Sequence, residues 1–113
     1  MITITEEITK DTVKKTIVEA VKLNIKEKGW SKEQAFREVW HTDKLMRLGV
    51  ELGYFTFEQG INTTYRMFTN NLKELTKEGY LIYTSLINYP YTGAVEYILS
   101  FKGEKWIESE LDR

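Results

Sequence analysis

The chain has 113 residues, and its 16 basic and 17 acidic side chains leave a formal net charge of −1. Its 42% hydrophobic and 13% aromatic content predict one folded, soluble domain, residues 1–113, and argue against intrinsic disorder. The absence of cysteine excludes disulfides and thiolate chemistry, and no apolar stretch approaches the length that spans a membrane. Because the first residues also lack the apolar region of a signal peptide, we expect a cytoplasmic protein.

The N-terminal half, residues 11–53, is predicted to form three helices. The first runs from about residue 11 to residue 28 and ends at Gly29, since glycine favours a left-handed helix end. Its apolar side chains recur at intervals of four: Val13, Ile17, Val21 and Ile25. This stripe either covers the domain's own core or pairs with the same helix of a second copy in a homodimer.

The second and third helices of this half are marked by residues that favour helix starts. Ser31 followed by Gln34 is the pattern of a capping box, so a helix is expected to begin there and to run to about His41. Either Thr42 or Asp43 can then cap the third helix through a side-chain oxygen.

Residues 62–78 are predicted to form one long amphipathic helix. The side chains expected on its buried face follow one another at steps of three and four: Ile61, Tyr65, Phe68, Leu72 and Leu75. The opposite face consists of hydrogen-bond donors: Thr63, Arg66, Asn70, Lys73 and Lys77. Such a stripe is either an ordinary solvated surface or the contact face of a binding protein.

Residues 80–101 are predicted to form a two-stranded β-hairpin, and residues 103–111 a short closing helix. Aromatic and β-branched side chains follow Gly79, and a turn around Pro90 separates them from the returning strand. The hairpin carries no Lys or Arg and a single acid, Glu96. The elements together predict a mostly helical fold with a small β-hairpin, in the α+β class.

The end of the long helix resembles a known superfamily. The segment from Asn70 to Ile82, NNLKELTKEGYLI, is similar to the end of the recognition helix in winged helix-turn-helix regulators of the MarR-like and PadR-like bacterial families. The segment from Leu99 to Trp106, LSFKGEKW, is similar to the end of their returning strand and the helix after it. This resemblance covers residues 56–111 and implies a winged-helix fold whose helix 62–78 enters the major groove of duplex DNA.

The resemblance also implies which side chains contact DNA. On the family pattern, five of them face the major groove: Thr63, Thr64, Arg66, Asn70 and Lys73. Arg66 would read guanine and Asn70 adenine, each through two hydrogen bonds to the base edge. Lys73 and Lys77 would bind phosphate.

The chain departs from the family pattern at two places. Gly60 resembles the glycine turn of the motif, but its spacing to Leu72 is two residues longer than usual. Either the recognition helix has an extra half turn, or Gly60 is not that turn. Family members commonly place Arg or Lys at the wing tip, whereas this tip offers Asn88, Tyr89 and Tyr91.

Two functions from different classes therefore remain open. The donor stripe on the long helix favours a small DNA-binding transcriptional regulator, working as a dimer. The near-neutral charge and the aromatic wing tip favour a protein-interaction module that keeps a winged-helix frame, such as a phage or mobile-element protein of the anti-CRISPR or host-takeover type.

Catalysis and metal binding are not expected. His41 is the only histidine, there is no cysteine, and the seven glycines are too dispersed for a phosphate-binding loop. We interpret His41, beside Trp40, as a partly buried structural residue. No enzyme activity and no cofactor is predicted.

Overall fold

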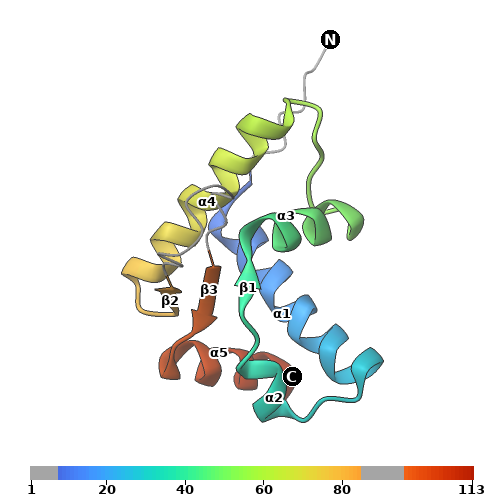
Figure 1. The fold of residues 1–113 in the computed structure, drawn as a ribbon, viewed down its shortest axis with the longest axis vertical. Helices are drawn as coiled ribbons and strands as arrows, with labels where there is room; N and C mark the ends of the chain where they lie inside the picture. The colour runs from blue at the N-terminus through green and yellow to red at the C-terminus, as the bar shows by residue number, and fades with distance from the viewer. Residues whose placement is uncertain (1–7, 85–95) are drawn as a thin grey trace.

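A computed structural model describes residues 8–84 and 96–113 (Figure 1). The described elements follow one another as α1 (Lys10–Lys28), α2 (Lys32–Phe36), β1 (Trp40–His41), α3 (Thr42–Glu51), α4 (Ile61–Lys77), β2 (Leu81–Thr84), β3 (Glu96–Leu99) and α5 (Phe101–Leu111). Helices thus make up most of the described chain, and the strands form one small antiparallel sheet. The predicted α+β class is confirmed.

The sheet has one strand more than the sequence predicts. Its order is β1-β3-β2, with Trp40 opposite Tyr97 and Tyr97 opposite Tyr83. The second helix was expected to continue to about His41, which is wrong, because α2 ends at Phe36 and Trp40–His41 forms β1. Pairing with β3 buries the Trp40 side chain, so tertiary contact overrides the weak local helix preference here.

The end of α1 and the starts of α2 and α5 follow the local signals in the sequence. The prediction that Thr42 or Asp43 caps the third helix is wrong, because α3 begins at Thr42 after His41 and has no side-chain cap. Gly29 adopts a left-handed φ of 68° after α1, and both hydrogen bonds of the Ser31–Gln34 capping box are present at the start of α2. The hydroxyl of Ser100 accepts from the Gly103 backbone N–H, so α5 begins at Phe101, two residues before the predicted start. Caps therefore fix these boundaries.

The apolar stripe of α1 lies in the domain's own core. Val13, Ile17 and Val21 are fully buried, together with Phe68 and Leu72 of α4. Of the two roles considered for this stripe, core formation is confirmed. The same side chains are consequently not available to pair with a second copy.

The connection between α3 and α4, residues 52–60, is held down by an aromatic anchor. Phe55 is buried, and its ring centroid lies 5.8 Å from that of Phe68. A Cβ on Gly49 would lie 2.4 Å from the Phe55 ring, so only glycine leaves room for the anchor. Gly60, with a φ of 97°, is the last residue before α4, and its backbone N–H donates to the Phe57 carbonyl oxygen at 2.8 Å, so a turn over residues 57–60 ends this long connection.

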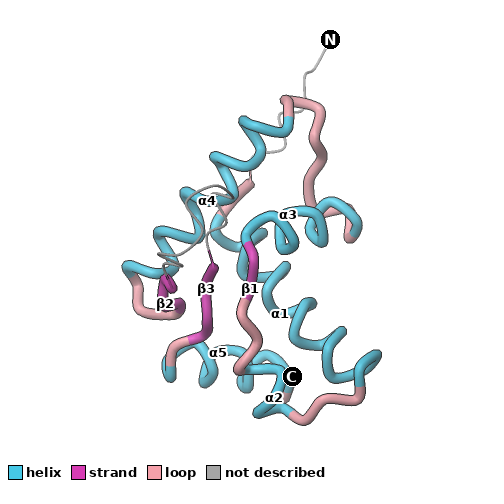
Figure 2. Tube along the Cα trace, viewed as in Figure 1, coloured by secondary structure: helices cyan, strands magenta, loops and turns pink. Residues whose placement is uncertain are grey.

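Within residues 8–84 and 96–113, no other element covers the side of α4 that carries Arg66 and Lys73. Figure 1 and Figure 2 show the three strands side by side, with α2 and α5 at one end of the sheet and α3 and α4 toward the other. The end of α4 leads directly into β2, which is the edge strand of the described sheet next to this helix. The candidate site is built around that junction.

Candidate nucleic-acid interface

The buried face of α4 determines which of its side chains point outward. Phe68, Leu72 and Leu75 are fully buried against the rest of the domain. Side chains on the far side of the same helix must then face solvent, because a helix repeats every 3.6 residues. The structure places four of the predicted contact residues in exposed positions on that side: Arg66, Asn70, Lys73 and Lys77. Thr63 lies beside them and is half-buried.

Thr64 does not belong to this surface. Its side chain is fully buried, and its hydroxyl donates to the carbonyl oxygen of Gly60 at 2.8 Å. The expectation that Thr64 faces a major groove is therefore corrected. The physical reason is helix geometry, since residues two apart, such as Thr64 and Arg66, lie on nearly opposite sides of a helix.

Three lysines from other parts of the chain gather at the C-terminal end of α4. The Lys10 ammonium lies 2.8 Å from a carboxylate oxygen of Glu78. The Lys102 ammonium donates to the backbone carbonyl of Glu78 at 2.7 Å, where the last carbonyls of a helix attract cations. Lys14 lies over the rings of Tyr80 and Trp106, at 4.8 and 5.0 Å from their centroids.

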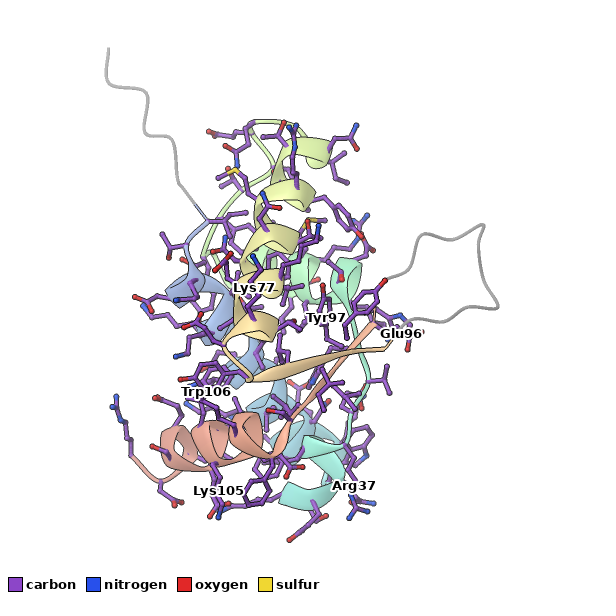
Figure 3. The ribbon with its side chains drawn as sticks, turned by 90° about the vertical axis from the view of Figure 1, so that its left-hand side faces the viewer. Arg37, Lys77, Glu96, Tyr97, Lys105 and Trp106 are labelled. Atoms are coloured by element: carbon purple, nitrogen blue, oxygen red, sulfur yellow. The ribbon has the colours of Figure 1, made fainter. Side chains whose placement is uncertain are left out.

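Aromatic packing holds this lysine cluster in place. The rings of Tyr80 and Trp106 meet edge to face with centroids 5.5 Å apart, and Lys102 lies 4.5 Å from the Tyr80 centroid on that same ring. Figure 3 shows Lys77 on α4 and Trp106 on α5 close to the start of β2. A cation beside an aromatic face is stabilised by the negative charge on the ring face. The cluster thus joins the starts of α1 and α5 to the end of α4.

Glu78 is the carboxylate around which these lysines gather. The hydrogen bond from Lys10, with the attraction of Lys10, Lys14 and Lys102, lowers the pKa of Glu78 below its ordinary value. The same hydrogen bond raises the pKa of Lys10. Among the described residues along α4 and around Glu78, six cations oppose three carboxylates: Lys10, Lys14, Arg66, Lys73, Lys77 and Lys102 against Asp11, Glu74 and Glu78. A locally basic surface therefore exists on a chain of net charge −1.

The charged groups of the exposed cations on α4 are available to bind a ligand. Among the residues that the structure describes, neither Arg66 nor Lys73 makes an ion pair, and Lys77 reaches Glu74 only at 3.7 Å. An exposed pair at that distance contributes little and is readily replaced by another anion. Binding phosphate would not require a strong ion pair to break.

A groove beside α4 was not predicted from the sequence. It has a volume of about 570 Å³, and its lining comes from α4 on one side and from β2 and β3 on the other: Tyr65, Thr69, Lys73, Thr76, Lys77, Tyr83 and Tyr97. Tyr65 was expected on the buried face of the helix, and it is partly buried at the groove wall. The groove could not be predicted because it depends on the cross-strand pairing of Tyr83 with Tyr97, which the sequence does not show.

The remaining predicted features divide into two groups. Asn88, Tyr89 and Tyr91 of the wing tip lie outside the described residues. His41 is exposed, so the interpretation of a partly buried histidine is wrong.

Within residues 8–84 and 96–113, no three His, Asp or Glu side chains converge as metal ligands, and none of the helices is long and apolar enough to cross a membrane.

Comparison of the chain with protein-family models, with curated proteins and with solved structures gives no match. The geometry of α4 and its neighbours is therefore the basis for assigning a function.

Proposed function

We propose that this protein binds duplex DNA through the outer face of α4, as a small winged-helix regulator. The observation that carries the proposal is the exposed donor stripe of α4, with three more lysines gathered at the C-terminal end of the same helix. The position of α4, after α3 and directly before the antiparallel strands β2 and β3, supports it, because winged-helix proteins present their recognition helix beside such a hairpin.

Base reading is assigned to the middle of α4. Arg66 and Asn70 are exposed and one helical turn apart, so their side chains project from the same face. A guanidinium matches the two acceptors of guanine, and a carboxamide matches the donor and acceptor of adenine. Thr63 extends this face toward the start of the helix.

Phosphate binding is assigned to the lysines around this centre. Lys73 and Lys77 project from the last turns of α4, and the lysine cluster continues the positive surface beyond the helix end. Ammonium groups bind phosphate as mobile point charges, which gives affinity without sequence preference. The middle of α4 would therefore supply sequence specificity, and the surrounding lysines would supply affinity.

Salt dependence of binding to random duplex DNA tests the proposal. Each phosphate contact releases counterions and adds about −0.9 to the slope of log affinity against log salt. We expect clear binding at low salt and a steep loss as salt rises. The matched variants are Lys73→Ala/Lys77→Ala, on α4, and Lys26→Ala/Lys28→Ala, in the last turn of α1. Only the first should reduce the slope. No binding at low salt would remove DNA as the ligand.

One observation favours the alternative of a protein-interaction module. The face of the sheet that carries Ile82 exposes apolar side chains, since Ile82 is 47% exposed and lies opposite Ile98. Val39, 40% exposed, adjoins the same strands. A second copy is the partner that can be tested directly, by sedimentation equilibrium over a wide concentration range. Self-association that disappears in Ile82→Asp would show that this face binds a second copy, and a wild-type chain that stays monomeric would exclude the second copy as partner.

A further inference from the structure

A groove of about 410 Å³ lies between α1, α3 and β1, and it shares no residue with the candidate interface on α4. One wall comes from α1, between Ala20 and Lys28, and the other from α3, between Lys44 and Glu51. Residues 38–41, which include β1, form the third side. Figure 1 shows β3 on one side of β1 and α1 on the other, so the groove runs along the edge of β1 that β3 does not occupy.

The edge of β1 offers backbone hydrogen-bonding groups to this groove. Within the described sheet, β1 pairs only with β3, through Trp40 opposite Tyr97 and His41 opposite Glu96. In an antiparallel pair, successive residues alternate between directing their N–H and C=O groups toward the partner strand and away from it. One of the two β1 residues therefore directs its backbone groups to the other side. An unpaired edge of this kind can accept an added strand.

Two buried side-chain donors line the same groove. The Nδ2 atom of Asn24 and the Nε1 atom of Trp40 are shielded from solvent and have no acceptor among the residues that the structure describes. Both residues are only 8% exposed. A buried N–H group without an acceptor costs free energy, so a carbonyl oxygen that reached it would be bound favourably. The side-chain rotations that commonly accompany binding would bring these donors to an occupant.

The charges around the groove favour a basic occupant. Three carboxylates of the lining make no ion pair within residues 8–84 and 96–113: Glu27, Glu38 and Glu51. Two of the three lining cations are already engaged, since Lys28 lies 4.6 Å from the centroid of the Trp30 ring and Arg47 donates to Asp43 at 2.9 Å. Only Lys44 remains to offset the carboxylates. A Lys or Arg side chain would find a partner here, whereas an acidic ligand would be repelled.

We infer that this groove binds an extended, Lys- or Arg-bearing peptide segment of a partner protein, added beside β1 as a further strand of the sheet. An extended backbone supplies carbonyl oxygens for both buried donors and N–H and C=O groups for the free edge of β1. A helical segment would not, because its backbone groups are paired internally. The inference is independent of DNA binding by α4.

Selection of peptides tests the groove without DNA. The probe is a displayed library of random linear peptides of about eight residues, within the ordinary length of a strand. We expect enrichment of peptides in which Lys or Arg accompanies β-branched residues. The most enriched peptide, added to the isotope-labelled protein, should shift the indole N–H resonance of Trp40 more than those of Trp30 and Trp106. Hydrogen exchange of the β1 amides should slow at the same time.

Charge variants show whether the selected peptide uses this groove. Replacement of the groove carboxylates, in Glu27→Gln/Glu38→Gln/Glu51→Gln, should weaken its binding by about tenfold, the loss of one charge-assisted contact. The matched control makes the same charge change in the groove between α2 and α5: Glu33→Gln/Glu104→Gln/Glu108→Gln. The control should leave the affinity unchanged, because exposed charges at a distance are screened. Circular dichroism checks that both variants are folded.

Tryptophan variants test the buried donor. Trp40→Phe keeps an aromatic ring at the site and removes the N–H group, so peptide binding should weaken by about threefold to tenfold, the contribution of one neutral hydrogen bond. Trp30→Phe, at a partly buried residue outside the groove lining, should leave the affinity unchanged. Peptide binding that neither substitution alters would remove the Trp40 donor from the site.

The outcomes decide between an added strand and other occupants. Failure of the library to yield any binding peptide would overturn the inference, as would enrichment of acidic peptides. A selected peptide that is helical when bound, or that binds Glu27→Gln/Glu38→Gln/Glu51→Gln as tightly as wild type, would overturn it too. A DNA titration of the same variants is a separate measurement. The peptide site can therefore stand if no DNA binds, and the DNA function can stand if no peptide binds.

Discussion

The outer face of α4 and the outer face of the sheet are exposed surfaces of one small domain, yet they differ completely in charge. Arg66, Lys73 and Lys77 project from the first, whereas the second exposes Val39 and Ile82. Residues 80–101 contain no Lys or Arg. A chain of net charge −1 thus exposes cations on one of these two faces and apolar side chains on the other.

This contrast shows why net charge is a poor guide to partners for a small domain. Interactions between exposed charges are screened over about 8–10 Å at physiological ionic strength. A phosphate on α4 therefore responds to the lysines around Glu78 and not to acids on remote elements. The predictions below test the contrast, beginning with the packing that orients α4.

Phe68→Ala is expected to have the largest effect. The side chain is fully buried and packs against Phe55, so truncation should lower the free energy of unfolding by about 3–5 kcal/mol. Phe101→Ala is the matched control, because Phe101 is 74% exposed and should change stability by less than about 0.5 kcal/mol. Urea unfolding followed by circular dichroism measures both. Equal effects of the two substitutions would contradict the orientation of α4 and with it both faces.

Gly103→Ala tests how α5, the helix that carries Lys102, packs against the residue before β2. Alanine is favoured over glycine in a helix by about 1 kcal/mol, so on local preference the substitution stabilises α5. The structure predicts the opposite, since a Cβ there would lie 2.1 Å from the Tyr80 carbonyl oxygen, which is backbone and cannot move away cheaply. We expect a net loss of about 1–3 kcal/mol in urea unfolding. A stabilised variant would show that α5 does not pack against the start of β2 in this way.

Arg66→Ala and Lys73→Ala should separate base reading from phosphate binding. Loss of Arg66 should cost about 1–3 kcal/mol of DNA affinity and relax the preference at one position of the selected sequence. Loss of Lys73 should weaken binding to all sequences alike and reduce the salt slope by about one contact. Selection from random duplexes, followed by titration at several salt concentrations, measures both. If the two variants behave identically, the assignment of Arg66 to a base is wrong.

The parts of the site that could be predicted from sequence are those set by neighbours along the chain. The period of the apolar residues placed Arg66 and Lys73 on the outer face of α4, and capping residues located the end of α1 and the start of α2. Thr64 was misplaced because it was carried over from a family pattern, although the helical period alone puts it on the inner side. Local periodicity was the better guide.

The parts that could not be predicted depend on packing between distant segments. The lysine cluster forms because α1 and α5 pack beside the end of α4, which brings Lys10 and Lys102 to Glu78 from opposite ends of the chain. β1 is too short for any sequence pattern and exists because β3 pairs with it. The tyrosine groove likewise requires the register that places Tyr83 opposite Tyr97. Each of these contacts joins residues that lie far apart in the sequence, so no local sequence pattern indicates it.

Glu78→Gln should have the smallest effect on stability and the opposite effect on DNA binding. The pKa of Glu78 is lowered in the folded state, mainly by the hydrogen bond from Lys10, so its stabilising contribution is present above the unfolded-state pKa and is lost as pH falls through the folded-state pKa. Wild type should therefore be slightly more stable than Glu78→Gln at neutral pH, and the two should converge in acid.

The same substitution removes a carboxylate from the basic surface, so DNA affinity at low salt should rise while stability falls. Urea unfolding across neutral and acid pH and a DNA titration measure the two effects. Glu27→Gln is the control, because Glu27 is exposed on α1 and makes no ion pair within the described residues. A stability difference independent of pH would show that Lys10 does not act on the ionised Glu78. Unchanged DNA affinity would separate the lysine cluster from the DNA-binding surface and restrict that surface to the outer face of α4.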